Sequence, residues 1–155
     1  MMASFADVAA RIASMAAAMK DTQVDVLDEM ATRIQERAKE KIGHYQDESG
    51  PFNAWAQLKK STQRERERHG YTPNDPLLRT GGLRDSIKKA IYGSFAVVGS
   101  DSMLAVYHEF GTHGPGVGPD GWHDPPRPFL GPAAYESREW VGEVVTEWVR
   151  KCLAA

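Results

Sequence analysis

The sequence predicts a chain that combines long helices with an antiparallel β-hairpin. The prediction depends on three observations: a helical hydrophobic period over residues 3–42, two short β-prone runs around a glycine turn, and an amphipathic C-terminal segment. The chain has 155 residues. That length suits one hydrophobic core, so we expect a single domain over residues 1–155.

Residues 3–42 predict the long N-terminal helix. Apolar residues recur there in steps of three and four, which places them along one side of a helix. They are Phe5, Val8, Ile12, Met15, Met19, Val26, Met30, Ile34 and Ala38. The period misses one beat near Thr22, and Asp21 or Thr22 could cap a second helix, so a kink there is an open alternative. The stripe either packs in the core or faces a partner helix. For the second alternative the candidate interface residues are Phe5, Val8, Ile12, Met15 and Met19.

The middle of the chain predicts a short helix and then a hairpin. Residues 46–53 form a loop with Gly50-Pro51 as its breaker, residues 54–69 are helical, and residues 70–76 form a second loop. Residues 86–92 and 95–99 are β-prone and flank the turn signal Gly93-Ser94. Residues 103–110 fit either a helix or a third strand.

The last third predicts a loop, an extended strap and a helix. Residues 111–121 hold five glycines and two prolines, so we expect a mobile loop without secondary structure that makes contacts on assembly. Its candidate contact residues are His113, Val117 and Asp120, together with Trp122, which directly follows the loop. Residues 125–132 are extended, and a helix begins at Ala133 with Pro132 at its start. Its expected buried stripe is Trp140, Val141, Val144, Val145, Trp148, Val149 and Cys152.

Charge and cysteine content indicate a soluble protein. The formal net charge is −2, but residues 53–91 carry nine basic and four acidic residues, an excess of five positive charges. A small nucleic-acid-binding module is therefore one alternative, with Arg64, Arg66, Arg68, Lys88 and Lys89 as its contacts. The single cysteine allows no internal disulfide. We find no convincing signal peptide and no membrane-length apolar run, so we expect a soluble, cytoplasmic product with no membrane partner.

Two patterns suggest chemistry, and neither fits it well. His108, Glu109 and His113 resemble a zinc-protease signature, but the second histidine stands five residues after the first instead of four, and Gly111 ends the helix. With His123 as a third ligand, a metal-dependent hydrolase remains an alternative. Residues 116–121 match a dinucleotide-binding pattern without the helix that must follow it. We expect no enzyme activity, no metal and no cofactor.

Three blocks in order resemble one known family. The first is Trp55-Ala56-Gln57-Leu58 with Ser61-Thr62, and the second is residues 77–87, which contain Arg79-Thr80-Gly81-Gly82-Leu83. The third joins Val98-Gly99-Ser100, residues 107–112 and residues 127–133. Together these blocks, over roughly residues 50 to 135, are similar to the tail-completion and virion-morphogenesis proteins of Mu-like and lambda-like long-tailed phages.

The resemblance implies an α+β fold with a long N-terminal helix, a small antiparallel β-sheet and a C-terminal helix packed on the sheet. It also implies a structural virion protein at the phage neck or tail end, which completes the tail or joins it to the head. On this precedent we expect a homo-oligomeric ring of about six copies that contacts tail-tube or head-connector proteins, with DNA passing through it without specific binding. We expect some residues of the three blocks to stabilise the fold rather than to contact other proteins. These structural-motif residues are Gly81, Leu83, Ser86, Ile87, Glu109, Phe110, Gly111, Arg127, Pro128, Phe129 and Leu130.

Overall fold

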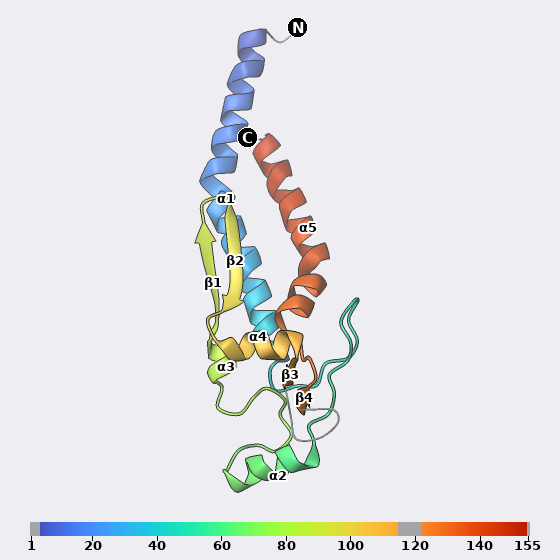
Figure 1. Cartoon of the computed structure of the whole chain (residues 1–155). Helices are drawn as coiled ribbons and strands as arrows, with labels where there is room; N and C mark the ends of the chain where they lie inside the picture. Colours follow the sequence, from blue (N-terminus) through green and yellow to red (C-terminus); the bar gives the residue numbers. More distant parts are fainter. Residues whose placement is uncertain (1–3, 115–121, 155) are drawn as a thin grey trace.

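Two long helices and a β-hairpin make up the upper part of the protein in Figure 1. The computed structural model describes residues 4–114 and 122–154, without the side chains of residues 113, 114, 122 and 123. Helix α1 (Phe5–Lys41) contacts both helix α5 (Leu130–Ala154) and the hairpin of β1 (Ile87–Tyr92) and β2 (Phe95–Ser100). The predicted α+β fold is confirmed: a long N-terminal helix, an antiparallel sheet and a packed C-terminal helix.

Helix α1 is one continuous helix, so no second helix begins at Asp21 or Thr22, although the axis of α1 bends beside the tip of the hairpin (Figure 1). Ser4 and Asp7 form a reciprocal capping box, in which the Ser4 side chain accepts from the Asp7 N–H and the Asp7 carboxylate accepts from the Ser4 N–H. Thr22 does not start a new helix because its hydroxyl donates to the Ala18 carbonyl inside the same helix, at 2.7 Å. The helix ends before Gly43, whose φ of 100° breaks the helical path.

Side-chain contacts hold α5 against α1 near both ends of the region where the two helices lie side by side. At the lower end the buried Lys41 ammonium lies 2.8 Å from the Glu136 carboxylate. Near the middle the Arg33 guanidinium lies 4.3 Å from the centre of the Trp140 ring. At the upper end the Trp148 indole donates to the Thr22 hydroxyl at 2.8 Å. These contacts join α5 to α1 at Glu136, Trp140 and Trp148.

Helix α5 differs from its prediction in its start and in its buried face. It begins at Leu130, three residues before the expected Ala133. Of the seven residues in the expected buried stripe, only Cys152 is buried and the others are half-buried. The physical reason is that α5 packs mainly on one other helix, α1, which covers only part of an apolar face.

The hairpin has the predicted strands and turn. Ile87 pairs with Ser100 at its base and Tyr92 pairs with Phe95 at its tip, around Gly93 with φ 58°. The Lys89 ammonium reaches Asp28 and Thr32 of α1, at 2.6 Å from each oxygen. This contact fixes the hairpin along α1.

The lower part of the protein is built from short elements: α2 (Lys60–Arg68), α3 (Gly82–Asp85), α4 (Met103–Phe110), β3 (Thr112–Gly114) and β4 (Trp122–Asp124). The helix expected over 54–69 starts only at Lys60, since Trp55 is buried and its indole donates to the Pro128 carbonyl at 3.0 Å. Residues 103–110 are a helix, capped by Ser102. The expected absence of secondary structure in 111–121 is wrong for residues 112–114, which pair with β4.

The core lies where the base of the hairpin, the strap before α5 and the lower halves of α1 and α5 meet. Phe129 and Ile87 are fully buried there, together with Ala38 and Ala133. Trp55 and Leu83, which come from the lower part of the protein, also belong to this core. Within the described residues, no helix is both long enough and apolar enough to cross a membrane.

Candidate assembly surfaces

Glu109 caps helix α5 from the end of helix α4. Its two carboxylate oxygens accept hydrogen bonds from the backbone N–H groups of Phe129, Leu130 and Gly131, at 2.9, 3.1 and 2.7 Å. A carboxylate at a helix N-terminus satisfies unpaired N–H groups and offsets the helix dipole. Glu109 therefore explains why α5 begins at Leu130, and both of its oxygens are used in doing so.

Arg127 binds the strap, the extended segment from residue 125 to the start of α5, to the rest of the fold. Its side chain is buried, its Nε and Nη2 donate to the Ala56 carbonyl at 3.2 and 3.0 Å, and its Nη1 donates to Asp124 at 3.2 Å. Pro128 and Phe129 are buried after it, and Leu130 is half-buried. The strap thus connects the segment before α2 to the start of α5.

Two glycines of the structural motif occupy backbone positions that suit glycine. Gly81 has φ 86° and precedes α3. Gly111 has φ 74° and ends α4, and a Cβ there would lie 2.9 Å from the Asp124 carbonyl oxygen. Leu83 and Ile87 are buried on either side of Ser86, whose hydroxyl donates to the Leu83 carbonyl at 2.6 Å.

Phe110 is the member of the structural motif that faces solvent. It is 76% exposed, so it adds little to the core. It shares one side of α4 with Met103, Val106 and Tyr107, which are also exposed and follow the helical spacing of three and four residues. We call these four residues the α4 surface. The sequence reasoning missed Met103, Val106 and Tyr107, because the same spacing is typical of a buried helix face.

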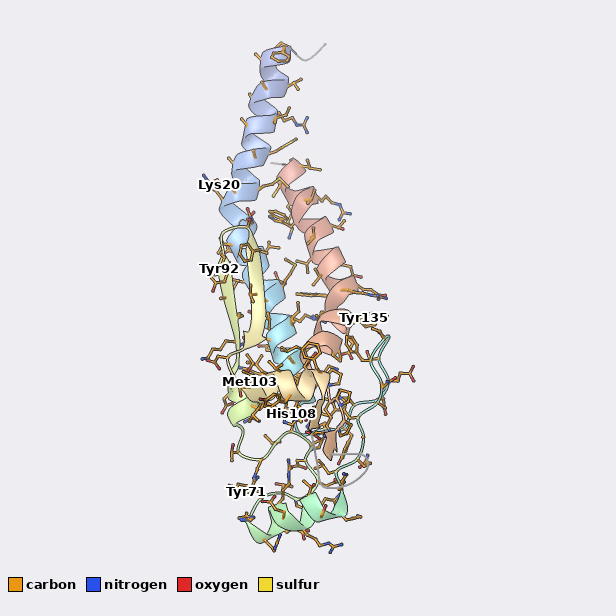
Figure 2. All side chains as sticks on the ribbon, in the orientation of Figure 1. Lys20, Tyr71, Tyr92, Met103, His108 and Tyr135 are labelled. Carbon is orange, nitrogen blue, oxygen red and sulfur yellow. The ribbon has the colours of Figure 1, made fainter. Side chains whose placement is uncertain are left out.

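The hairpin exposes a second group of apolar residues. Tyr92 and Phe95 stack at its tip with their ring centres 5.4 Å apart, and Val97 follows on the same face as Phe95. Figure 2 shows Tyr92 on the hairpin, above Met103 at one end of α4. These three residues form the hairpin surface.

The N-terminal part of α1 is the third exposed apolar element. Figure 1 shows α1 continuing well past the C-terminal end of α5. Residues 5–14 are all exposed, including Phe5 at 90%, Val8 at 46% and Ile12 at 61%. We call residues 5–14 the N-terminal arm. Met15 and Met19, the other two candidates on this stripe, are half-buried at the base of the arm.

The loop candidates cannot be placed in the same way. Val117 and Asp120 lie outside the described residues. His113 and Trp122 are described by their backbones alone, in strands β3 and β4.

The arrangement does not favour the metal-dependent hydrolase. Glu109 is committed to the start of α5 by three hydrogen bonds. The Nδ1 atom of His108 is buried, lies 3.8 Å from the Asp124 carboxylate, and has no hydrogen-bond partner among the described residues. Burial lowers the pKa of His108; Asp124 opposes this shift, and the charges of Arg127 and Arg66 add to it. His113 and His123 pair across β3 and β4, and their side chains are outside the described part.

The residues of the nucleic-acid hypothesis do not form one surface. Arg66 is buried and donates to the carbonyls of Asp75 and Leu78 at 2.6 and 3.3 Å. Lys89 is bound to α1, and Lys88 pairs with Asp101. Arg64 and Arg68 are exposed on α2, at the far end of the protein from most of the hairpin.

The exposed apolar side chains gather on three elements, which makes these elements candidates for contacts with other proteins. Scattered apolar residues are normal on a protein surface, whereas aligned groups on a helix or a hairpin mark interfaces. The α4 surface, the hairpin surface and the N-terminal arm are three such groups.

A comparison with known protein families agrees with this interpretation. The model of the phage virion morphogenesis family matches residues 3–150, nearly the whole chain. No curated protein and no solved structure gives a significant match.

Proposed function

The chain belongs to the phage virion morphogenesis family, and we propose that it completes the phage tail or joins it to the head by forming a homo-oligomeric ring. A family of this kind supports a structural rather than an enzymatic role. In the proposal the ring has about six copies and contacts tail-tube or head-connector proteins. DNA crosses its channel without specific contacts.

One structural observation supports a function based on interfaces. The α4 surface, the hairpin surface and the arm expose apolar residues on three different elements. Subunits of a ring need two different surfaces each, because every copy contacts one neighbour on each side, and a third surface for the tail or the head. The exposed surfaces meet this requirement.

The proposal is tested by deleting the gene from the phage or prophage that carries it and imaging the particles. We expect filled heads without tails, or tails of irregular length, and recovery of normal particles when the intact gene is supplied separately. Normal particles from the deletion strain would contradict a role at the neck or tail end.

A second measurement locates the chain. Mass spectrometry of purified particles should detect it, and gold-labelled antibody should mark one end of the tail. Label spread along the tail tube or over the head shell would contradict the proposed position.

A further inference from the structure

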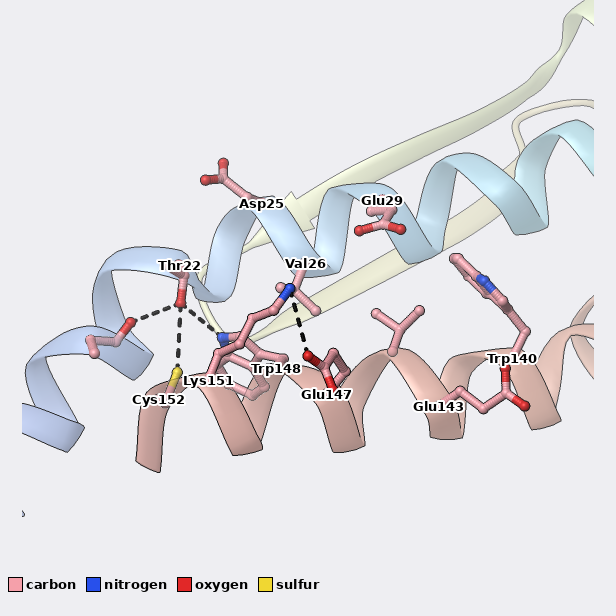
Figure 3. Close-up of a pocket in the computed structure, with 12 residues that line it drawn as sticks. Thr22, Asp25, Val26, Glu29, Trp140, Glu143, Glu147, Trp148, Lys151 and Cys152 are labelled. Carbon is pink, nitrogen blue, oxygen red and sulfur yellow. Dashed lines mark hydrogen bonds and ion pairs between the residues drawn. The ribbon is translucent and has the colours of Figure 1, made fainter. Parts of the chain in front are cut away.

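An open groove lies between the upper halves of α1 and α5, next to the base of the arm. It has a volume of about 640 Å³. Its apolar lining comes from Val26 of α1 and from Trp140, Val144 and Trp148 of α5. Figure 3 shows Val26, Trp140 and Trp148 in the space between the two helices. Trp140, Val144 and Trp148 are half-buried, so a third helix lying in the groove between α1 and α5 would cover them further.

Specific contacts bridge α1 and α5 at the upper end of this groove. The Thr22 hydroxyl accepts from the Trp148 indole and donates to the Ala18 carbonyl, and it lies 3.9 Å from the Cys152 sulfur (Figure 3). These contacts fix the indole ring beside α1. The groove is therefore a shaped feature of the folded chain, with its walls already in place.

The groove is acidic at its rim. Asp25, Glu29, Glu143 and Glu147 line it together with a single lysine, Lys151, which gives four negative charges against one positive charge. Glu147 is already paired with Arg150 at 2.5 Å and lies 3.9 Å from Lys151, so Asp25, Glu29 and Glu143 supply most of the negative charge that remains. A ligand for this groove should combine an apolar face with a basic residue.

The arm of the same chain has these features. Phe5, Val8 and Ile12 form an exposed apolar stripe that continues through Met15 and Met19 toward Thr22, in steps of three and four. Arg11 is one turn from both Val8 and Met15, so it lies beside the stripe. The only acid of the arm, Asp7, is already engaged by Ser4.

The dimensions of the arm and the groove also agree. From Phe5 to Met15 the stripe spans about 15 Å, and from Trp140 to Cys152 the α5 wall spans about 18 Å, at 1.5 Å of rise per residue. The arm cannot fold back into its own groove, because the arm and the α1 wall of the groove belong to one continuous helix. The occupant must come from another molecule.

We propose that the N-terminal arm of one copy docks into the α1–α5 groove of a second copy. The inference rests on the proposed homo-oligomer and names the contact that builds it. Phe5, Val8 and Ile12 pack on Trp140, Val144 and Trp148, and Arg11 faces the acidic rim. In the proposed ring, each copy gives its arm to one neighbour and receives an arm from the other.

Single cysteines test this contact directly. In a Cys152→Ser background, one population carries Val8→Cys on the stripe and a second, of different tagged size, carries Glu147→Cys on the groove rim. After mixing and mild oxidation, a mixed disulfide can only join two copies. We expect it to form about tenfold faster than with Ala10→Cys, which lies on the opposite side of the arm. The reaction is run in solution and within purified particles.

The outcomes separate this inference from the proposed function. Rings or particles that contain the chain but give equal or no linkage from Val8→Cys and Ala10→Cys would overturn the docking and leave the assembly role intact. Absence of the chain from purified particles would instead overturn the proposed function.

A matched pair of charge variants gives an independent measurement. Ile12→Asp should abolish assembly, because it buries a charge in the apolar groove. Ala10→Asp adds the same charge to the same turn and should assemble as the native chain does. Both residues are fully in the exposed arm, so both variants should keep the native circular-dichroism spectrum. Equal assembly of the two variants would contradict the docking.

Discussion

At the scale of single residues, the short motif around Glu109 connects distant parts of the fold. The motif could be recognised in the sequence, but its partners could not. Glu109 binds residues 129–131, which lie about twenty positions later in the sequence. Arg127 binds Ala56, which lies 71 positions earlier. No local pattern encodes such contacts, because they depend on how the elements pack.

The first prediction concerns the cap that Glu109 gives to α5. Glu109→Ala removes the acceptor of three backbone N–H groups and should lower the free energy of unfolding by about 2 kcal/mol. Urea unfolding followed by circular dichroism measures it. Glu139→Ala, a change on the exposed side of the same α5 helix, is the control and should cost less than about 0.5 kcal/mol. Equal losses in the two variants would show that the cap contributes nothing of its own.

The second prediction concerns the buried ring of His108. Burial lowers its pKa below the ordinary value of 6.5, so the unfolded chain takes up this proton at a higher pH than the folded chain does. The stability that depends on neutral His108 is therefore fully present above pH 6.5 and decreases as the pH falls below it.

The measurement compares urea midpoints at pH 7.5 and pH 5.5 for the native chain and for His108→Gln. The native chain should lose more stability on acidification than the variant, whose side chain does not titrate. An identical loss in both would assign the acid sensitivity to groups other than His108.

At the scale of elements, the sequence period predicted α1, the hairpin and α5, but not which faces are covered. Val106 and Phe110 have the spacing of a buried stripe and are exposed, whereas most of the α5 stripe is only half-covered. Periodicity reports that one side of a helix is apolar; it does not report whether the partner for that side belongs to the same chain.

The third prediction separates assembly from folding on helix α4. Val106→Ser with Phe110→Ser should change the free energy of unfolding by less than about 1 kcal/mol, since both side chains are exposed and serine has a similar helix propensity. Particle yield should nevertheless fall. Ala105→Ser is the control for folding. Ala105 is only 5% exposed, so this change should reduce stability while it leaves the residues of the α4 surface unchanged. Normal particle yield from the double variant would remove α4 from the interface.

The fourth prediction concerns the order of the arm before and after assembly. A helix of about ten residues without tertiary contacts is marginal in water, although here it extends a longer packed helix and has a capping box. Amides of residues 8–14 should therefore exchange with deuterium much faster than amides of residues 30–38 in the free protein. In the assembled particle they should become protected. Unchanged exchange of the arm on assembly would mean that the arm stays uncovered.

At the scale of the whole molecule, one end of the protein holds the core and the other end holds the arm. The contacts that define the native fold gather where the strap, the hairpin base and the lower halves of α1 and α5 meet. The arm lies beyond the end of α5 and adds no residue to that core. In the proposed assembly, folding and docking would therefore use different residues of the same helix α1, and a truncation can separate them.

Removal of residues 1–13 is the fifth prediction, and it leaves Ser14 in position to cap the shortened helix. Because residues 4–13, the described part of the deleted segment, are exposed, the free energy of unfolding should change by less than about 1 kcal/mol. Light scattering over a range of concentrations should show a monomer where the full chain associates, and the truncated chain should not restore particles to the deletion strain. If the shortened chain were unstable, the arm would belong to the fold; if it assembled normally, another surface would hold the copies together. A stable monomer without assembly would show that the long helix α1 contributes its lower two-thirds to the fold and its N-terminal end to the particle.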